Sequence, residues 1–210
     1  SSDAAAARVV SGVDVGEACE KAQLPSKQTA AMIAFAARSE NFIDRLRIAS
    51  PTPEDLHMLD AFIEEGIDMV AISFVRSAHD VRRVGVEPHP RGPLVVAKIE
   101  TRAAVENLEG FIEASGAIMV ARGDLGIEMG IEELPHIQKH IIRECIALGR
   151  PVITATQMLE SMITAATPTR AEVSDVANAI FDGSSAVMLS AETAVGADPV
   201  NVVETMSRIS

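Results

Sequence analysis

From residue 51 onward, short apolar runs of strand length alternate with amphipathic stretches of helical length. The apolar runs cover residues 69–74, 94–100, 117–122, 151–156 and 185–190. Near-continuous apolar strands separated by helices are typical of a parallel sheet that is covered on both faces. Two helix starts support this interpretation: residues 52–55 and 169–172 both resemble N-terminal caps, and the second matches the capping-box pattern. The pattern therefore predicts a strand followed by a helix, repeated about five times.

Residues 1–50 have a different character. They are rich in alanine, and residues 26–46 (SKQTAAMIAFAARSENFIDRL) place apolar side chains at roughly helical spacing. Strand and helix patterns do not clearly alternate there. We expect a helix-rich N-terminal segment over residues 1–50, of unclear assignment, followed by a partial barrel over residues 51–210.

Five strand–helix units fit either an open doubly wound sheet or part of a (β/α)₈ barrel. A complete barrel typically needs eight strands and about 250 residues, which is more than the 210 residues of this chain. The barrel is favoured nevertheless, because barrels gather their chemistry at the carboxyl ends of the strands. Each apolar run here ends in a reactive side chain: Ser73, Lys98 with Glu100, Asp124, Thr156, and Ser190 with Glu192. The predicted fold is thus an α/β protein with an incomplete parallel barrel of the TIM type.

The composition excludes several classes of function. The formal net charge is −12 and no run of Lys and Arg exceeds two residues, which argues against binding nucleic acid or an anionic membrane through charge. The absence of Trp and Tyr also argues against a surface that stacks bases. Cys19 and Cys145 lack metal-site spacing and indicate a reducing compartment. With no signal peptide or membrane-spanning apolar run in the sequence, we expect a cytoplasmic location.

Lys98 and Glu100 are the strongest candidates for chemistry. Residues two apart on a strand share a face, so both side chains are expected to point into the mouth of the barrel. One interpretation is a purely structural ion pair between them. The other is a functional site, because Asp124 at the next strand end supplies a second carboxylate and Mg²⁺ typically takes one or two protein carboxylates. With the backbone N–H groups around Gly123, this set is suited to phosphoryl transfer from a phosphorylated carboxylic acid.

Four segments resemble consecutive blocks of the pyruvate kinase family, in the family's order and spacing. They are AKIETRAAVENLEGF, IMVARGDLGIEMG, GRPVITATQMLESMI and PTRAEVSDVANAIFDGSSAVMLSAETAVGADP. The resemblance covers about Pro51 to Ser210 and implies transfer of the phosphoryl group of phosphoenolpyruvate to ADP, giving pyruvate and ATP in glycolysis. It also implies Mg²⁺ or Mn²⁺, with K⁺ as a further candidate cofactor, and a homo-oligomer. The early barrel strands, lid domain and C-terminal domain of the family have no match, so we expect an incomplete barrel without them.

The resemblance implies a role for each central residue. Lys98 matches the lysine that stabilises the transferring phosphoryl group, and Glu100 and Asp124 match the carboxylates that hold Mg²⁺. The backbone N–H groups of Gly123 and Asp124, together with Thr156, match positions that bind the substrate carboxylate. Thr156 is in addition a candidate for positioning the relay that protonates the enolate.

Further positions are implied to line the same site. Ser73, Ser190 and Glu192 match such positions, whereas Arg122 is expected to be a structural pairing residue. The family usually has glycine where Ala191 stands. Two other functions remain open: a Mg²⁺-dependent lyase or aldolase of the related phosphoenolpyruvate and pyruvate barrels, and a non-catalytic barrel fragment that binds a partner or a metabolite.

Overall fold

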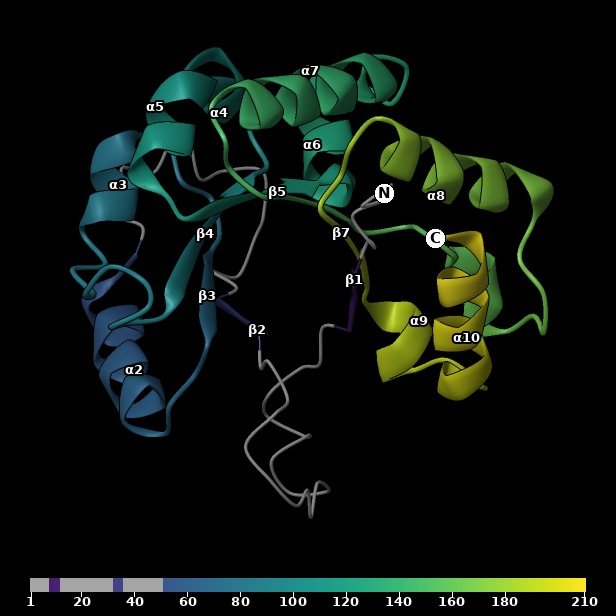
Figure 1. Ribbon diagram of the computed structural model, residues 1–210, viewed down its shortest axis with the longest axis horizontal. Helices are drawn as coiled ribbons and strands as arrows, with labels where there is room; N and C mark the ends of the chain where they lie inside the picture. The colour runs from purple at the N-terminus through teal and green to yellow at the C-terminus, as the bar shows by residue number, and fades with distance from the viewer. Residues whose placement is uncertain (1–7, 12–31, 36–50) are drawn as a thin grey trace, which may run out of the picture.

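The computed structural model describes residues 8–11, 32–35 and 51–210 of the chain. Its strands form one seven-stranded parallel sheet, and Figure 1 shows this sheet curving, with helices along its outer side. In chain order the elements are β1 (Arg8–Ser11), β2 (Met32–Phe35), α2 (Pro53–Glu64), β3 (Met69–Ile72), α3 (Ala78–Arg82), β4 (Leu94–Ile99), α4 (Arg102–Glu106), α5 (Leu108–Ala114), β5 (Ala117–Ala121), α6 (Arg122–Met129), α7 (Leu134–Ala147), β6 (Val152–Ala155), the 3₁₀ helix η1 (Glu160–Ile163), α8 (Arg170–Phe181), β7 (Ala186–Leu189), α9 (Ala191–Ala194) and α10 (Pro199–Ile209).

The order of the strands distinguishes between the two architectures that the sequence allowed. The order is β1-β7-β6-β5-β4-β3-β2, so that from β2 to β7 each strand pairs with the next one in the sequence. A doubly wound sheet reverses its strand order at a switch point, and the strands of the described residues contain no such reversal. Sequential parallel pairing, with the first strand beside the last, is the arrangement of a barrel.

The two faces of the sheet carry different hydrophobic layers. Among the residues that the structure describes, the layer on the inner face consists of strand side chains, such as Ala71, Val96 and Met119. On the outer face, strand residues pack against helices. Val120 belongs to one such layer, and Val187 packs in another with residues of α8 and α10. A doubly wound sheet carries helices on both faces. The helices of the described residues lie along the outer face of a curved sheet (Figure 1), which also indicates a barrel.

The strands and helix starts predicted after residue 51 are confirmed. All five apolar runs form strands, β3 to β7. Thr52 and Thr169 both begin helices, and each side chain accepts a hydrogen bond from the backbone N–H three residues later while that residue's carboxylate bonds back. In the part of the chain that the structure covers, no helix is long and apolar enough to span a lipid bilayer.

Two expectations differ from the structure. Residues 32–35 were expected in a helix, but they form the strand β2. This strand pairs with β3 in a register that puts Met32 opposite Met69. Residues 8–11 form β1 beside β7, and the other residues of the 1–50 segment lie outside the described residues. At the end of β5, Arg122 is the first residue of α6 rather than the last residue of a strand. The helix thus begins directly at the strand end.

Candidate active site at the strand ends

The carboxyl ends of β3 and β4 bring three predicted site residues into contact. Ile72 pairs with Ala97, so the residues that follow them, Ser73 and Lys98, lie side by side. Lys98 Nζ donates a hydrogen bond to Ser73 Oγ at 2.8 Å and lies 2.5 Å from Glu100 Oε1. The predicted pairing of Lys98 and Glu100 on one face of β4 is therefore present.

The Glu100 carboxylate is buried, and one of its oxygens lacks a directed hydrogen bond. The side chain is 0% exposed. Oε2 accepts a hydrogen bond from the backbone N–H of Phe74 at 2.6 Å, an arrangement in which Phe74 adopts a left-handed conformation with φ 52°. Oε1 has no hydrogen-bond partner among the described residues, although the Lys98 amine is close enough for an ion pair. A buried carboxylate oxygen of this kind is suited to binding a cation.

Burial dominates the electrostatics of Glu100. It raises the pKa of the carboxyl above its usual value, because the charged form loses its hydration. The positive charge of the nearby Lys98 amine and the N–H of Phe74 lower the pKa of Glu100 but do not cancel the effect of burial. The negative charge of Asp124 raises the pKa further. A divalent cation bound between Glu100 and Asp124 would offset the repulsion between the two negative charges.

A second part of the site joins the start of α6 to the end of β6. The backbone N–H of Gly123 donates to Thr156 Oγ1 at 2.9 Å, and the Thr156 hydroxyl donates to the carbonyl of Ala155 at 2.6 Å. A Cβ built on Gly123 would lie 3.7 Å from Thr156 Oγ1, which is ordinary van der Waals contact. The packing of the surrounding protein therefore does not require glycine at position 123.

Arg122 has the structural pairing role that the sequence predicted. Its side chain is 7% exposed, and Nη1 lies 2.6 Å from Asp175 Oδ2 on α8. Nη2 donates to the carbonyls of Thr156 at 2.7 Å and Gln157 at 3.0 Å. Thr156 and Gln157 are both left-handed, with φ 68° and 53°. A left-handed β-branched residue such as threonine is costly and needs support of this kind from its surroundings.

Glu192 joins two neighbouring strand ends through the backbone. It is 2% exposed. Its Oε1 accepts from the backbone N–H groups of Met158 and Leu159, both at 3.2 Å, and Oε2 accepts from the N–H of Ser190 at 2.8 Å. Both carboxylate oxygens thus bind the protein's own backbone. The sequence could not indicate this role, because two of the three partners lie more than 30 residues away on another strand end.

The described residues fit a Mg²⁺ or Mn²⁺ site built from two carboxylates. They contain no group of three or more His, Cys, Asp or Glu side chains that could hold a metal ion by themselves. Mg²⁺ does not need such a cage, because it usually binds through one or two carboxylates and completes its shell with water and phosphate. Glu100, whose buried Oε1 forms an ion pair with Lys98 but accepts no directed hydrogen bond among the described residues, and Asp124, in the first turn of α6, supply that number.

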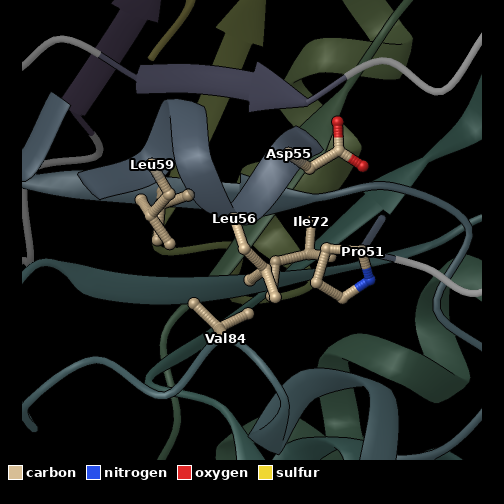
Figure 2. Close-up of a pocket in the computed structure, with 7 residues that line it drawn as sticks. Pro51, Asp55, Leu56, Leu59, Ile72 and Val84 are labelled. Atoms are coloured by element: carbon tan, nitrogen blue, oxygen red, sulfur yellow. The ribbon is translucent and has the colours of Figure 1, made fainter. Parts of the chain in front are cut away.

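A small apolar hollow lies away from these residues, on the outer side of β3. Figure 2 shows that it is lined mainly by apolar side chains and that the carboxylate of Asp55 points away from them. Asp55 is already used at the start of α2, where its Oδ2 accepts from the N–H of Thr52 at 2.8 Å. The lining residues are Pro51, Asp55, Leu56, Leu59, Val70, Ile72 and Val84. This hollow lacks groups for catalysis and is distinct from the site at the strand ends.

Fold and site together define a parallel α/β barrel protein whose polar residues cluster at the carboxyl ends of the strands. The family described as "Pyruvate kinase, barrel domain" matches residues 41–203. The chain belongs to the pyruvate kinase family.

Several curated pyruvate kinases are similar to this chain. The pyruvate kinase of Bacillus licheniformis is 50% identical over 162 residues, which cover 76% of this chain and 28% of that protein. One from Agrobacterium vitis is 51% identical over 164 residues, or 78% of this chain and 34% of that protein. One from Thermococcus litoralis is 50% identical over 167 residues, or 79% and 35%. The chain thus spans about a third of the length of these relatives.

Proposed function

We propose that the chain is the central part of a pyruvate kinase catalytic barrel, which transfers the phosphoryl group of phosphoenolpyruvate to ADP. The observation that carries this proposal is the contact of Lys98 with Glu100 at the end of β4. A lysine beside an incompletely bonded buried carboxylate, with a second acid acting on it, suits a metal and a phosphate better than a purely structural ion pair. The family assignment favours the same reaction over that of a lyase.

In the proposed reaction, the bond between phosphorus and the enolic oxygen breaks, and a bond to an oxygen of the ADP β-phosphate forms. Lys98 stabilises the negative charge on the transferring group, and Ser73 fixes the direction of the lysine amine. The N–H groups of Gly123 and Asp124 and the hydroxyl of Thr156 hold the substrate carboxylate. Gly123 and Thr156 bond to each other in the described structure, so substrate would exchange partners with this pair.

The remaining enolate takes up a proton on carbon to give pyruvate, and Thr156 positions the relay that delivers it. Ser190 lines the same end of the barrel. Glu100 and Asp124 would hold the divalent cation, which supplies positive charge that neutralises the phosphoryl oxygens when bound. Glu192 contributes by holding the backbone of the β6 strand end rather than by touching substrate.

Other parts of the proposal follow from the family assignment. The partners are phosphoenolpyruvate or pyruvate and ADP or ATP, with K⁺ as a further cofactor and a homo-oligomer as the assembly. The location is cytoplasmic, with no nucleic acid and no membrane as partners. These statements rest on the family to which the chain belongs.

The test is a Mg²⁺-dependent assay of pyruvate formation from phosphoenolpyruvate and ADP, with the full protein and its Lys98→Met variant. We expect kcat to fall by at least 10² to 10³, roughly what removal of one charge-stabilising group costs. Lys139→Met is the matched control, because Lys139 is also ion-paired, at 2.6 Å from Asp182, but lies on α7 away from the site. Carbon–carbon cleavage without ADP would instead support the lyase. No turnover of either kind would support a non-catalytic barrel.

A further inference from the structure

The turn after β6 is held in place from α8. Thr156 and Gln157 are the two left-handed residues of this turn, and their carbonyl oxygens both accept hydrogen bonds from the guanidinium of Arg122. Arg122 Nε adds a second bond to the Thr156 carbonyl at 3.1 Å. Asp175, which is 53 residues further along the chain, accepts from the opposite side of the same guanidinium at 2.6 Å.

A second contact ties the same helix to the same segment. Glu172, one turn before Asp175 on α8, accepts hydrogen bonds from the N–H and the hydroxyl of Ser161, at 2.7 and 2.5 Å. Ser161 lies in η1, directly after the turn. The first half of α8 therefore fixes the segment at its beginning, through Arg122, and at its end, through Ser161.

The position of the Thr156 hydroxyl depends on this turn. A threonine with φ 68° occupies an unfavourable conformation, at a cost on the order of 1–3 kcal/mol. Without the bonds from Arg122 to the carbonyls, the peptide units would relax toward negative φ and the hydroxyl would leave the N–H of Gly123. Arg122 is also the residue directly before Gly123. One guanidinium therefore orients both the Thr156 hydroxyl and the Gly123 N–H, which are proposed to bind the substrate carboxylate.

We propose that Asp175 is a positioning residue, which acts through Arg122 to hold the Thr156 hydroxyl at the Gly123 amide. Asp175 supplies the charge that fixes the guanidinium, and its side chain is 41% exposed and does not need to touch substrate. This inference deepens the proposed function, on which it rests for the role of Thr156 in binding substrate. The geometry of the turn can be measured independently of any turnover.

The test compares Asp175→Asn with Asp182→Asn in the full protein. The Asp175→Asn change keeps the shape of the side chain and removes its charge, while Asp175→Glu keeps the charge. Asp182 is a matched control, since it ends the same helix and pairs with Lys139 on α7 at the same distance of 2.6 Å. The first readout is amide hydrogen exchange, resolved by NMR, at the N–H groups of Gly123, Met158 and Leu159.

We expect Asp175→Asn to accelerate exchange at these three amides on the order of tenfold, because the turn opens more often when Arg122 loses its charged partner. In Asp182→Asn the three amides should stay within about twofold of the parent, and Asp175→Glu should recover much of the loss. Equal exchange in the Asp175→Asn and Asp182→Asn variants, or acceleration spread evenly over the whole barrel, would overturn the inference.

The second readout separates this inference from the proposed function. In the kinase assay, Asp175→Asn should lower kcat/KM for phosphoenolpyruvate roughly tenfold and leave KM for ADP within about twofold. If the parent protein shows no turnover, the proposed function fails while the exchange result still decides whether Asp175 holds the turn. If turnover is present but the variant retains the parent's kcat/KM and exchange rates, the inference fails and the proposed function stands.

Discussion

Replacing Glu192 with glutamine tests whether this residue supports the backbone or binds substrate. Glu192 is buried, and its two oxygens accept three backbone N–H groups, from Met158 and Leu159 after β6 and from Ser190 after β7. The carboxylate therefore ties two neighbouring strand ends together. Glutamine has the same shape but offers one accepting oxygen and one N–H₂ group that can only donate.

The cost follows from those three hydrogen bonds. Each bond to a charged acceptor contributes about 1.5–3 kcal/mol, and a bond to a neutral acceptor about 1 kcal/mol. If the oxygen of glutamine stays with Met158 and Leu159, the N–H of Ser190 loses its acceptor and faces another donor. One bond is lost and two are weakened, while a neutral amide costs less to bury. We expect the free energy of unfolding to fall by about 3 kcal/mol.

The assay is urea unfolding followed by far-UV circular dichroism, because the chain has no Trp or Tyr to serve as a fluorescent probe. Glu204→Gln is the control: the Glu204 side chain is 65% exposed and its ion pair with Arg208 spans 3.9 Å, so a change within about 0.5 kcal/mol is expected. If Glu192→Gln also stays within about 0.5 kcal/mol while KM for phosphoenolpyruvate rises, Glu192 is a substrate ligand and the structural interpretation is wrong.

Two further predictions concern stability. The pKa of Glu100 is raised by burial in the folded protein, so the stability linked to its proton is present below the ordinary value of 4.5 and is lost as the pH rises through the folded value. In metal-free protein, raising the pH from about 4 to 7 should therefore lower the thermal midpoint of the parent relative to that of Glu100→Gln. If the midpoints of the two proteins change in parallel, burial of the Glu100 carboxyl is not the cause. Gln157 is exposed with φ 53°, so Gln157→Gly should stabilise the fold by about 1 kcal/mol in urea titrations. The control Thr164→Gly, at an exposed position with φ −122°, should give no such gain, and destabilisation by Gln157→Gly would show that the left-handed turn is not strained.

Local patterns were sufficient to predict the strands and the residues that share a face on one strand. The run from Leu94 to Ile99 reads as a strand because it is almost uniformly apolar, and the parity of a strand then puts Lys98 and Glu100 on the same side. The helix caps at Thr52 and Thr169 are equally local, since their partners lie three residues away.

Features that depend on distant partners could not be predicted in this way. Met32–Phe35 has the same apolar character as a helical face, and its pairing with β3 decides in favour of a strand. The bonds of Glu192 to the β6 strand end and the pairing of Arg122 with Asp175 join residues more than 30 and 50 positions apart. The left-handed turn at Thr156 carries no glycine to mark it, so its conformation also depends on contacts from other strand ends.

The proposed metal site at the strand ends holds one divalent cation between Glu100 and Asp124, with the Lys98 amine beside it. Its most direct test is a crystal structure of the protein with Mn²⁺ and pyruvate, in which anomalous scattering locates the metal. We expect one strong peak about 2.0–2.3 Å from a carboxylate oxygen of Glu100 and from one of Asp124, with the Lys98 amine nearby. A metal bound elsewhere, or one that contacts neither carboxylate, would contradict it.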